Sequence, residues 1–233
     1  MSVCGNRIYS KVKRPPKELV DRFADLAVAD IADCMNKMGC VDSGIKPLNK
    51  TKLLGTAVTV RVPAGNNLMF HVALSLAQAG DVIVVDGSGY TERGISGENM
   101  IEIARQKGIR GFVVDGAVRD SRAAVDQNDF ALYARAIAPN AAFKGTGPGE
   151  INVPVCVGGI VVYPGDIIIG DEDGVAVVSP KYAETIAREA EELAARQAAN
   201  LELIKNGTSD RSWVEQALKD AGYLVIDKVW DED

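Results

Sequence analysis

Residues 97–120, GENMIEIARQKGIRGFVVDGAVRD, read as a helix followed by a buried strand. The first half has apolar residues near helical spacing and stops at Gly108, because glycine commonly ends helices. Residues 111–116 form a short β-branched run, as in strands buried on both faces, and residues 81–87 form a similar run before the helix. Together these segments predict a strand-helix-strand crossover and a partly parallel sheet.

Segments on both sides of this crossover extend the α/β pattern. Before it we expect one helix or two short ones over residues 17–38, a strand over residues 55–63 and a helix over residues 68–79. After it, residues 166–174 and 175–178 predict a hairpin, because strand character resumes directly after an Asp-Gly turn. The sequence therefore predicts an α/β fold with a mixed sheet.

The C-terminal part predicts a long helix. Ser179-Pro180 is a typical helix start, and the alanine- and glutamate-rich run continues to Asn206. At ~1.5 Å per residue this helix would be about 40 Å long, so its apolar side could contact its own sheet or a second subunit. We expect one α/β domain over residues 1–206, with the N-terminal helices and the long helix, and a helix-strand extension over residues 207–233.

Composition places the chain among ordinary globular proteins. Its 233 residues are 47% hydrophobic and 25% charged, which suffices for a full core and excludes disorder. The formal charge of -6 provides no basic field for nucleic acid or an anionic membrane. The four cysteines form no C-x-x-C pair and His71 is the only histidine, which excludes the usual zinc sites. We expect a cytoplasmic protein that binds neither nucleic acid nor membrane.

Two sets of polar residues flank the crossover. Residues 97–100 form the first turn of the helix, where free N–H groups and the positive end of the helix dipole favour an anion. Arg119 and Asp120 follow the next strand at its carboxyl end, where ligands of open α/β sheets bind. If both sets share one edge, a carboxylate for a hard metal lies beside a guanidinium for a substrate carboxylate. Without histidine in the set, Mg²⁺ or Mn²⁺ suits it better than Zn²⁺.

Other interpretations of these residues stay open. Asp120 could cap a helix that begins at Ser121, with Arg119 as a solvated charge. The glycines in residues 87–94 are similar to a dinucleotide-binding loop, although their spacing departs from that pattern. His71 is a candidate base, but a histidine one turn into a helix is more often a packing or capping partner.

Residues 97–120 closely resemble the core motif of the class II pyruvate aldolases, which cleave 4-hydroxy-4-methyl-2-oxoglutarate and 4-carboxy-4-hydroxy-2-oxoadipate. These enzymes share a superfamily with the regulator of ribonuclease E activity A. The resemblance covers roughly residues 29–193 and includes GTAVTV at residues 55–60 and GDVIVVD at residues 80–86. In this motif an acidic residue, Glu98, is followed after twenty positions by Arg119-Asp120. This pattern favours the enzyme branch, because the regulators do not keep that aspartate. The resemblance implies an α/β/α sandwich of the swivelling phosphohistidine-domain type.

The resemblance also implies a role for each polar residue. Asp120 would be the direct protein ligand of Mg²⁺ or Mn²⁺, and Glu98 an outer-shell carboxylate on metal-bound water. Arg119 and the amides of Asn99 and Met100 would hold the pyruvyl carboxylate and carbonyl. The expected substrate-binding residues are Gly97, Asn99, Met100 and Arg119.

Family members assemble as trimers or hexamers with sites at subunit boundaries, where a glutamate from the neighbour's long helix completes the water shell. Glu191 is our candidate for this catalytic glutamate, and Glu189 and Glu192 are nearly as good. We therefore expect a homotrimeric or homohexameric, metal-dependent lyase with retro-aldol and oxaloacetate decarboxylase activities. A non-catalytic, protein-binding regulator of RNA decay is the alternative.

Overall fold

The computed structural model describes residues 3–125 and 129–230. The chain divides into two compact units, Met1–Glu192 and Leu193–Asp233. The predicted domain boundary after residue 206 stays a prediction. The helices are α1 (Lys17–Asp21), α2 (Val28–Cys34), α3 (Leu68–Leu76), α4 (Glu98–Gln106), α5 (Arg122–Val125), α6 (Ala183–Lys205) and α7 (Ser212–Asp220). The strands are β1 (Lys46–Pro47), β2 (Leu53–Arg61), β3 (Asp81–Gly94), β4 (Gly111–Val118), β5 (Ala131–Ile137), β6 (Glu150–Ile151), β7 (Val155–Val157), β8 (Ile160–Val162), β9 (Ile167–Asp171) and β10 (Gly174–Val178).

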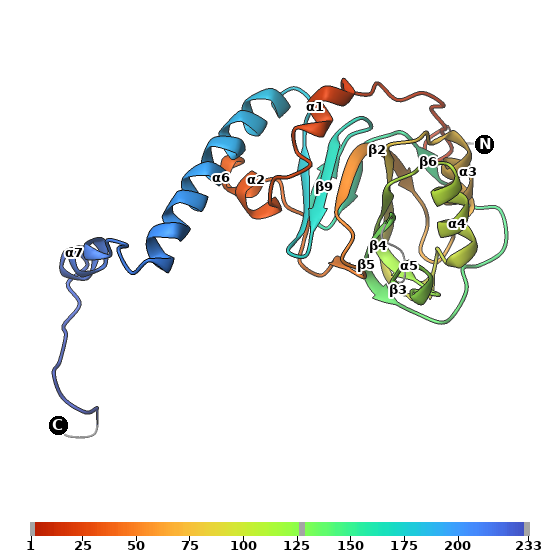
Figure 1. Ribbon diagram of the computed structural model, residues 1–233. Coiled ribbons are helices and arrows are strands. Elements are labelled where there is room, and N and C mark those ends of the chain that lie inside the picture. Colours follow the sequence, from red (N-terminus) through yellow and green to blue (C-terminus); the bar gives the residue numbers. More distant parts are fainter. Residues whose placement is uncertain (1–2, 126–128, 231–233) are drawn as a thin grey trace. The chain divides into compact units, whose positions relative to one another are not determined.

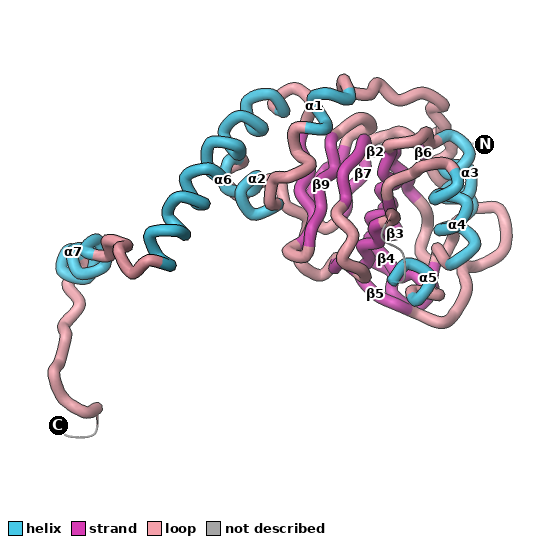
Figure 2. Tube along the Cα trace, in the orientation of Figure 1, coloured by secondary structure: helices cyan, strands magenta, loops and turns pink. Residues whose placement is uncertain are grey.

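The first unit is built on an eight-stranded mixed sheet (Figure 2). Strands β2, β3, β4 and β5 are parallel to one another, whereas β1, β6, β9 and β10 pair antiparallel. The sheet order is β1-β5-β4-β3-β2-β9-β10, with β6 pairing to β2. This topology confirms the predicted α/β class, the crossover through α4 and the β9–β10 hairpin.

The parallel strands are buried on both faces because each face has its own hydrophobic cluster. On one face Phe112 packs edge-on against Phe70 of α3, with ring centroids 4.8 Å apart, and Met100 of α4 belongs to the same cluster. Figure 1 shows α3 and α4 next to each other beside these strands. On the other face Val113 and Tyr133 belong to a cluster with β7 and β8. On this face the β7–β8 hairpin packs against β2 and β3, and α2 packs against β9 and β10.

One predicted alternative is decided and one predicted element differs from the structure. Residues 17–38 form two short helices, the second of the two alternatives, and Phe23 and Leu26 are buried in a non-helical turn between α1 and α2. The strand predicted to end at residue 87 continues to Gly94 through two register shifts, with Ser88 at φ 61°. The glycines of the dinucleotide-like interpretation therefore lie within β3 and not at a strand-to-helix turn, which contradicts that interpretation.

The second unit contains α7 but lacks the predicted strand within residues 221–230. Residues 223–226, Tyr-Leu-Val-Ile, have high strand propensity, yet all four are exposed and no neighbouring strand pairs with them in the described chain. The last three residues of the predicted extension lie outside the described residues. Across the ranges that the structure describes, none of the helices has the length and apolarity needed to cross a membrane.

Candidate active site

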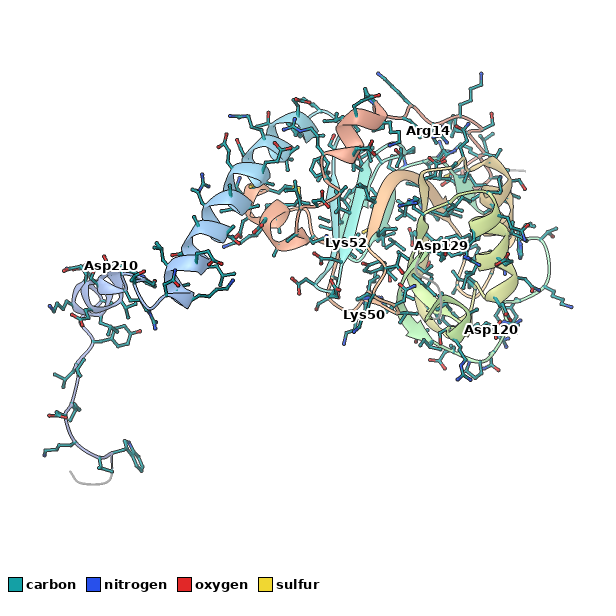
Figure 3. All side chains as sticks on the ribbon, viewed as in Figure 1. Arg14, Lys50, Lys52, Asp120, Asp129 and Asp210 are labelled. Atoms are coloured by element: carbon teal, nitrogen blue, oxygen red, sulfur yellow. The ribbon has the colours of Figure 1, made fainter. Side chains whose placement is uncertain are left out.

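Four parallel strands deliver four chain segments to one edge of the sheet. Asn67 and His71 follow β2, residues 97–100 follow β3, Arg119-Asp120 follow β4, and residues 141–145 follow β5. All four segments line one cavity of about 580 Å³. Figure 3 shows Asp120 at this carboxyl edge of the strands, whereas Arg14 lies at the opposite edge. The structure thus brings Gly97, Glu98, Asn99, Met100, Arg119 and Asp120 together, as their positions at the crossover predict.

Two glycines allow the end of β4 to approach the start of α4. The Arg119 N–H donates to the Ser96 carbonyl at 2.8 Å, which holds the two segments together. A Cβ added at Gly94 would lie 2.8 Å from the Cβ of Arg119. A Cβ added at Gly97 would lie 2.6 Å from Oδ2 of Asp120. Any side chain at either position would therefore displace the charged groups of the cavity.

Asp120 has a backbone conformation that favours aspartate, asparagine and glycine. Its φ is 52°, in the left-handed region, where a short polar side chain is tolerated. Its carbonyl accepts the N–H of Ala123 at 3.0 Å, so the backbone begins the α5 turn and the carboxylate stays available to the cavity. The Arg119 Nε lies 3.3 Å from Asp120 Oδ2, and both side chains are partly exposed. Such an exposed ion pair contributes little to stability. Exchanging it for contacts with a ligand would therefore cost little.

The first turn of α4 presents fewer free amides than expected. Met100 is buried and its N–H donates to the Gly97 carbonyl at 3.0 Å. The N–H groups of Glu98 and Asn99 precede this first hydrogen bond of the helix. The Met100 N–H is thus used within the helix, and Met100 contributes to the wall of the cavity.

The cavity also contains residues that sequence reasoning missed. Residues 141–145, which belong to no predicted element, line part of the cavity, and Lys144 was not among the candidates. The Asn67 Nδ2 donates to the Ile95 carbonyl at 3.1 Å and lies 3.4 Å from His71 Nε2. The only signal for this part of the site in the sequence was Lys144 beside a glycine. It could not be interpreted without knowing that β5 ends at the same edge of the sheet as β2, β3 and β4.

Glu191 lies on α6 and is held within its own subunit. The Arg22 guanidinium donates to both Glu191 carboxylate oxygens, at 2.9 and 2.7 Å. These hydrogen bonds keep the pKa of the Glu191 carboxyl below its usual value. Glu191 does not line the cavity of its own chain, so a catalytic role requires a neighbouring subunit.

The described residues contain no group of three or more histidine, cysteine, aspartate or glutamate side chains arranged to hold a metal ion. Within one chain the cavity offers the carboxylates of Asp120 and Glu98. Such a pair fits an ion that keeps most of its water, and it excludes an all-protein metal cage from this part of the chain.

The fold and cavity define an α/β protein with a charged pocket at the carboxyl edge of four parallel strands. This chain belongs to the Aldolase/RraA family, whose RraA-like model matches residues 28–177. It is 37% identical over 203 residues to a protein of Halalkalibacterium halodurans named "Putative 4-hydroxy-4-methyl-2-oxoglutarate aldolase", covering 86% of this chain and 96% of that protein.

Two solved structures share the fold. An unusual member of the RNase ES inhibitor RraA family from Streptomyces coelicolor matches with a TM-score of 0.73 and 27% identity, over 81% of this chain and 98% of that one. The RNA-processing inhibitor RraA of Thermus thermophilus matches with a TM-score of 0.60 and 30% identity, over 66% of this chain and 93% of that one. The family thus includes a protein named as an aldolase and proteins named as RNA-processing inhibitors.

Proposed function

We propose that this protein is a divalent-metal-dependent lyase that cleaves a C–C bond in small 2-oxo acids and releases pyruvate. One observation carries the proposal: Glu98, Arg119 and Asp120 line the same cavity, as the aldolase resemblance requires. The 37% identity to a protein named as an aldolase supports the same activity class. The proposed reactions are retro-aldol cleavage of 4-hydroxy-4-methyl-2-oxoglutarate and decarboxylation of oxaloacetate.

Asp120 and Glu98 fit Mg²⁺ or Mn²⁺. Mg²⁺ is commonly bound by one or two carboxylates and retains several waters, which matches a cavity with two carboxylates and no histidine-cysteine cluster. The missing side chain of Gly97 leaves space beside Asp120 Oδ2. Asp120 would hold the ion, and Glu98 would contact its water.

The remaining chemistry follows from charge. When bound, the ion would stabilise the negative charge that develops on the 2-oxo group during C–C cleavage, which can contribute several kcal/mol. Arg119 would hold the adjacent carboxylate through its planar fork and add to this stabilisation. In the retro-aldol reaction the C3–C4 bond breaks, the C4 hydroxyl loses its proton to water near Glu98, and C3 is protonated to give pyruvate. Such proton transfer typically contributes ~10²–10⁴-fold.

Oxaloacetate needs no base for the bond-breaking step. Its C4 carboxylate leaves as CO₂, and the electron pair moves toward the 2-oxo group, as in the aldol substrate. The same cavity would therefore support decarboxylation. We further propose a homotrimer or homohexamer in which Glu191, Glu189 or Glu192 of a neighbour completes the site.

The decisive experiment measures pyruvate release from both substrates with Mg²⁺, with Mn²⁺ and with excess EDTA. We expect release with either ion and its loss in EDTA. Release that is unchanged in EDTA would contradict metal dependence, and no release from either substrate under any condition would contradict the lyase.

A regulator of RNA decay is the second candidate, because the Thermus structure at 30% identity is named an RNA-processing inhibitor. A protein-binding regulator needs no metal ligand in this cavity. Inhibition of a ribonuclease that survives Asp120→Asn, in the absence of any pyruvate release by the unaltered protein, would favour this candidate.

A further inference from the structure

A second cavity, of about 500 Å³, lies at the amino edge of the parallel strands, opposite the edge that carries Asp120 (Figure 3). Its lining comes from residues 14–21 around α1, from residues 54–56 of β2 and from the turns that precede β3 and β4. Its volume is in the range of small-molecule sites. Among the described residues, none lines both this amino-edge cavity and the candidate active site, so the two are separate.

Asp81, at the start of β3, brings the polar residues of the amino-edge cavity together. Its buried carboxylate accepts two hydrogen bonds from Arg14, from Nε at 2.8 Å and from Nη2 at 2.6 Å. Its carbonyl accepts the Arg110 N–H at 2.8 Å, and its register partner in β2 is Thr56. Arg14, Thr56 and Arg110 are therefore all direct neighbours of one residue.

Arg14 retains donors for a ligand. A guanidinium has five N–H groups. Arg14 uses three of them, two on Asp81 and one on the Val12 carbonyl at 3.4 Å. The two parallel bonds to Asp81 also fix the plane of the guanidinium. Two N–H groups thus remain on an oriented arginine that lines the cavity.

Arg110 and Thr56 have unused polar groups. In the part of the chain that the structure describes, the Arg110 guanidinium and the Thr56 hydroxyl make no hydrogen bond or ion pair. The charge of Arg110 acts on Asp129, but that carboxylate is hydrogen-bonded to Arg105. Thr56 is only 5% exposed and lines the cavity, so a bound ligand can supply the hydrogen bond that its hydroxyl lacks.

The charges of the amino-edge cavity favour a ligand with one negative charge. Arg14 offsets the buried Asp81, and Lys17 forms an ion pair with Asp21 on α1. Arg110 is the charge that remains. Carboxylates accept bidentate hydrogen bonds from a guanidinium, which makes a carboxylate a suitable anion for this site.

The rest of the wall includes four apolar side chains, those of Pro15, Val20, Leu54 and Ala79. From this combination we infer that the amino-edge cavity binds a small free carboxylic acid with an apolar body. Arg110 and the remaining N–H groups of Arg14 would hold the carboxylate, the Thr56 hydroxyl would donate to it, and the body would lie against the apolar wall. The inference goes beyond the proposed function, and either can fail without the other.

Three probes test the charge and the apolar body separately. Pentanoate and pentanamide share a carbon chain and differ in charge, and acetate keeps the charge without the chain. Binding can be followed by NMR through the backbone N–H signals of Gly55, Gly80 and Gly108, which line the cavity. We expect pentanoate to shift these signals to saturation, with an affinity about tenfold or more above that of pentanamide or acetate.

Variants of the two cavities locate the bound acid. Arg110→Met removes an exposed, unpaired charge, so the fold should persist and the affinity for pentanoate should fall about tenfold or more. Thr56→Val removes the hydroxyl and should lower that affinity about threefold. Arg119→Met is the matched control, because it removes a cation from the candidate active site and should leave pentanoate binding unchanged.

The outcomes distinguish this inference from the proposed function. Absence of saturable shifts, or equal affinities for pentanoate and pentanamide, overturns the acid site. Binding that is lost in Arg119→Met and kept in Arg110→Met also overturns it, because the acid would then occupy the other cavity. Binding that depends on Arg110 in a protein that releases no pyruvate supports the acid site and contradicts the lyase.

Discussion

Gly97 and Asp120 are in contact across the mouth of the cavity, so closely that a single added methyl group would overlap the Asp120 carboxylate. A side chain at residue 97 would therefore displace the Asp120 carboxylate and crowd the side chain of Arg119. This contact joins the two halves of the crossover at the point where a substrate would bind.

Gly97→Ala should displace Asp120 and Arg119 with little effect on the fold. We expect kcat/KM for pyruvate release to fall about 10²-fold, as for a misplacement of about 1 Å. Gly116→Ala is the matched control, because its Cβ would make an ordinary contact, 3.4 Å from the nearest atom. Equal activity of the two variants would show that the contact has no role in the reaction.

Asp120→Asn and Asp120→Ala separate metal binding from backbone strain. Asparagine tolerates the φ of 52°, whereas alanine should cost about 1–2 kcal/mol of unfolding free energy in the left-handed region. Both lose the carboxylate, so pyruvate release should fall at least about 10²-fold in each. Thermal unfolding and Mn²⁺ titration provide the two measurements. Tight Mn²⁺ binding by Asp120→Asn would exclude Asp120 as the ligand.

Arg119→Lys keeps the positive charge and loses the planar fork. We expect kcat/KM to fall about tenfold or more, because lysine cannot hold a carboxylate through two parallel hydrogen bonds. Arg105→Lys, in the last turn of α4, is the control. Steady-state kinetics on both variants check this expectation, and an unimpaired Arg119→Lys would place the substrate carboxylate elsewhere.

Mixed oligomers test whether Glu191 serves a neighbouring site. Asp120→Asn and Glu191→Gln should each be weakly active alone. After joint refolding, some sites would combine an intact Asp120 with an intact Glu191 from the next subunit, so activity should rise well above that of either variant. If mixing restores nothing, the same experiment with Glu189→Gln and Glu192→Gln identifies another glutamate or rejects a shared site.

Stability should depend on pH through Asp166. This side chain is buried, and burial raises the pKa of its carboxyl above the usual value, although it accepts the Tyr163 N–H at 2.8 Å. A raised pKa in the folded state means that Asp166 favours folding most at low pH and loses that contribution as pH rises through the folded pKa. Asp166→Asn keeps an acceptor and stays neutral, so it should unfold a few degrees higher at pH 7, at about 2–4 °C per kcal/mol.

The gain from Asp166→Asn should shrink as the pH falls through the raised pKa of the folded state and should be absent below about pH 4, where the carboxyl is protonated in both states. Asp129→Asn is the control of opposite sign, because the hydrogen bond from Arg105 lowers the pKa of the Asp129 carboxyl. Thermal unfolding of both variants from pH 3 to pH 8 makes the comparison. A gain for Asp166→Asn that does not change with pH would show that its origin is not ionisation.

The sequence predicted those parts of the fold whose signals are local. Strands β2, β3 and β4 are β-branched runs between glycines, and α4 has a glycine at each end, so their order and the edge they share could be inferred. This sufficed to place Glu98, Arg119 and Asp120 together.

The parts that were missed depend on partners distant in sequence. Strand β5, ALYARAI, contains residues of modest strand propensity and is a strand because it pairs with β4. Without β5, the position of Lys144 could not be inferred. The tail strand shows the reverse case, since residues 223–226 have strand propensity but no pairing partner in the described chain.

The anchoring of residues 141–145 has a consequence for how this protein can diversify. The Phe143 N–H donates to the Gly65 carbonyl, and the Gly94 N–H donates to the carbonyl of Asn140, directly before the segment; nearly every amino acid carries the same main-chain groups. Side chains on this segment can therefore be exchanged while the candidate site residues after β3 and β4 stay in place. The same fold could in this way keep its site residues and bind a different ligand through substitutions at a few neighbouring positions.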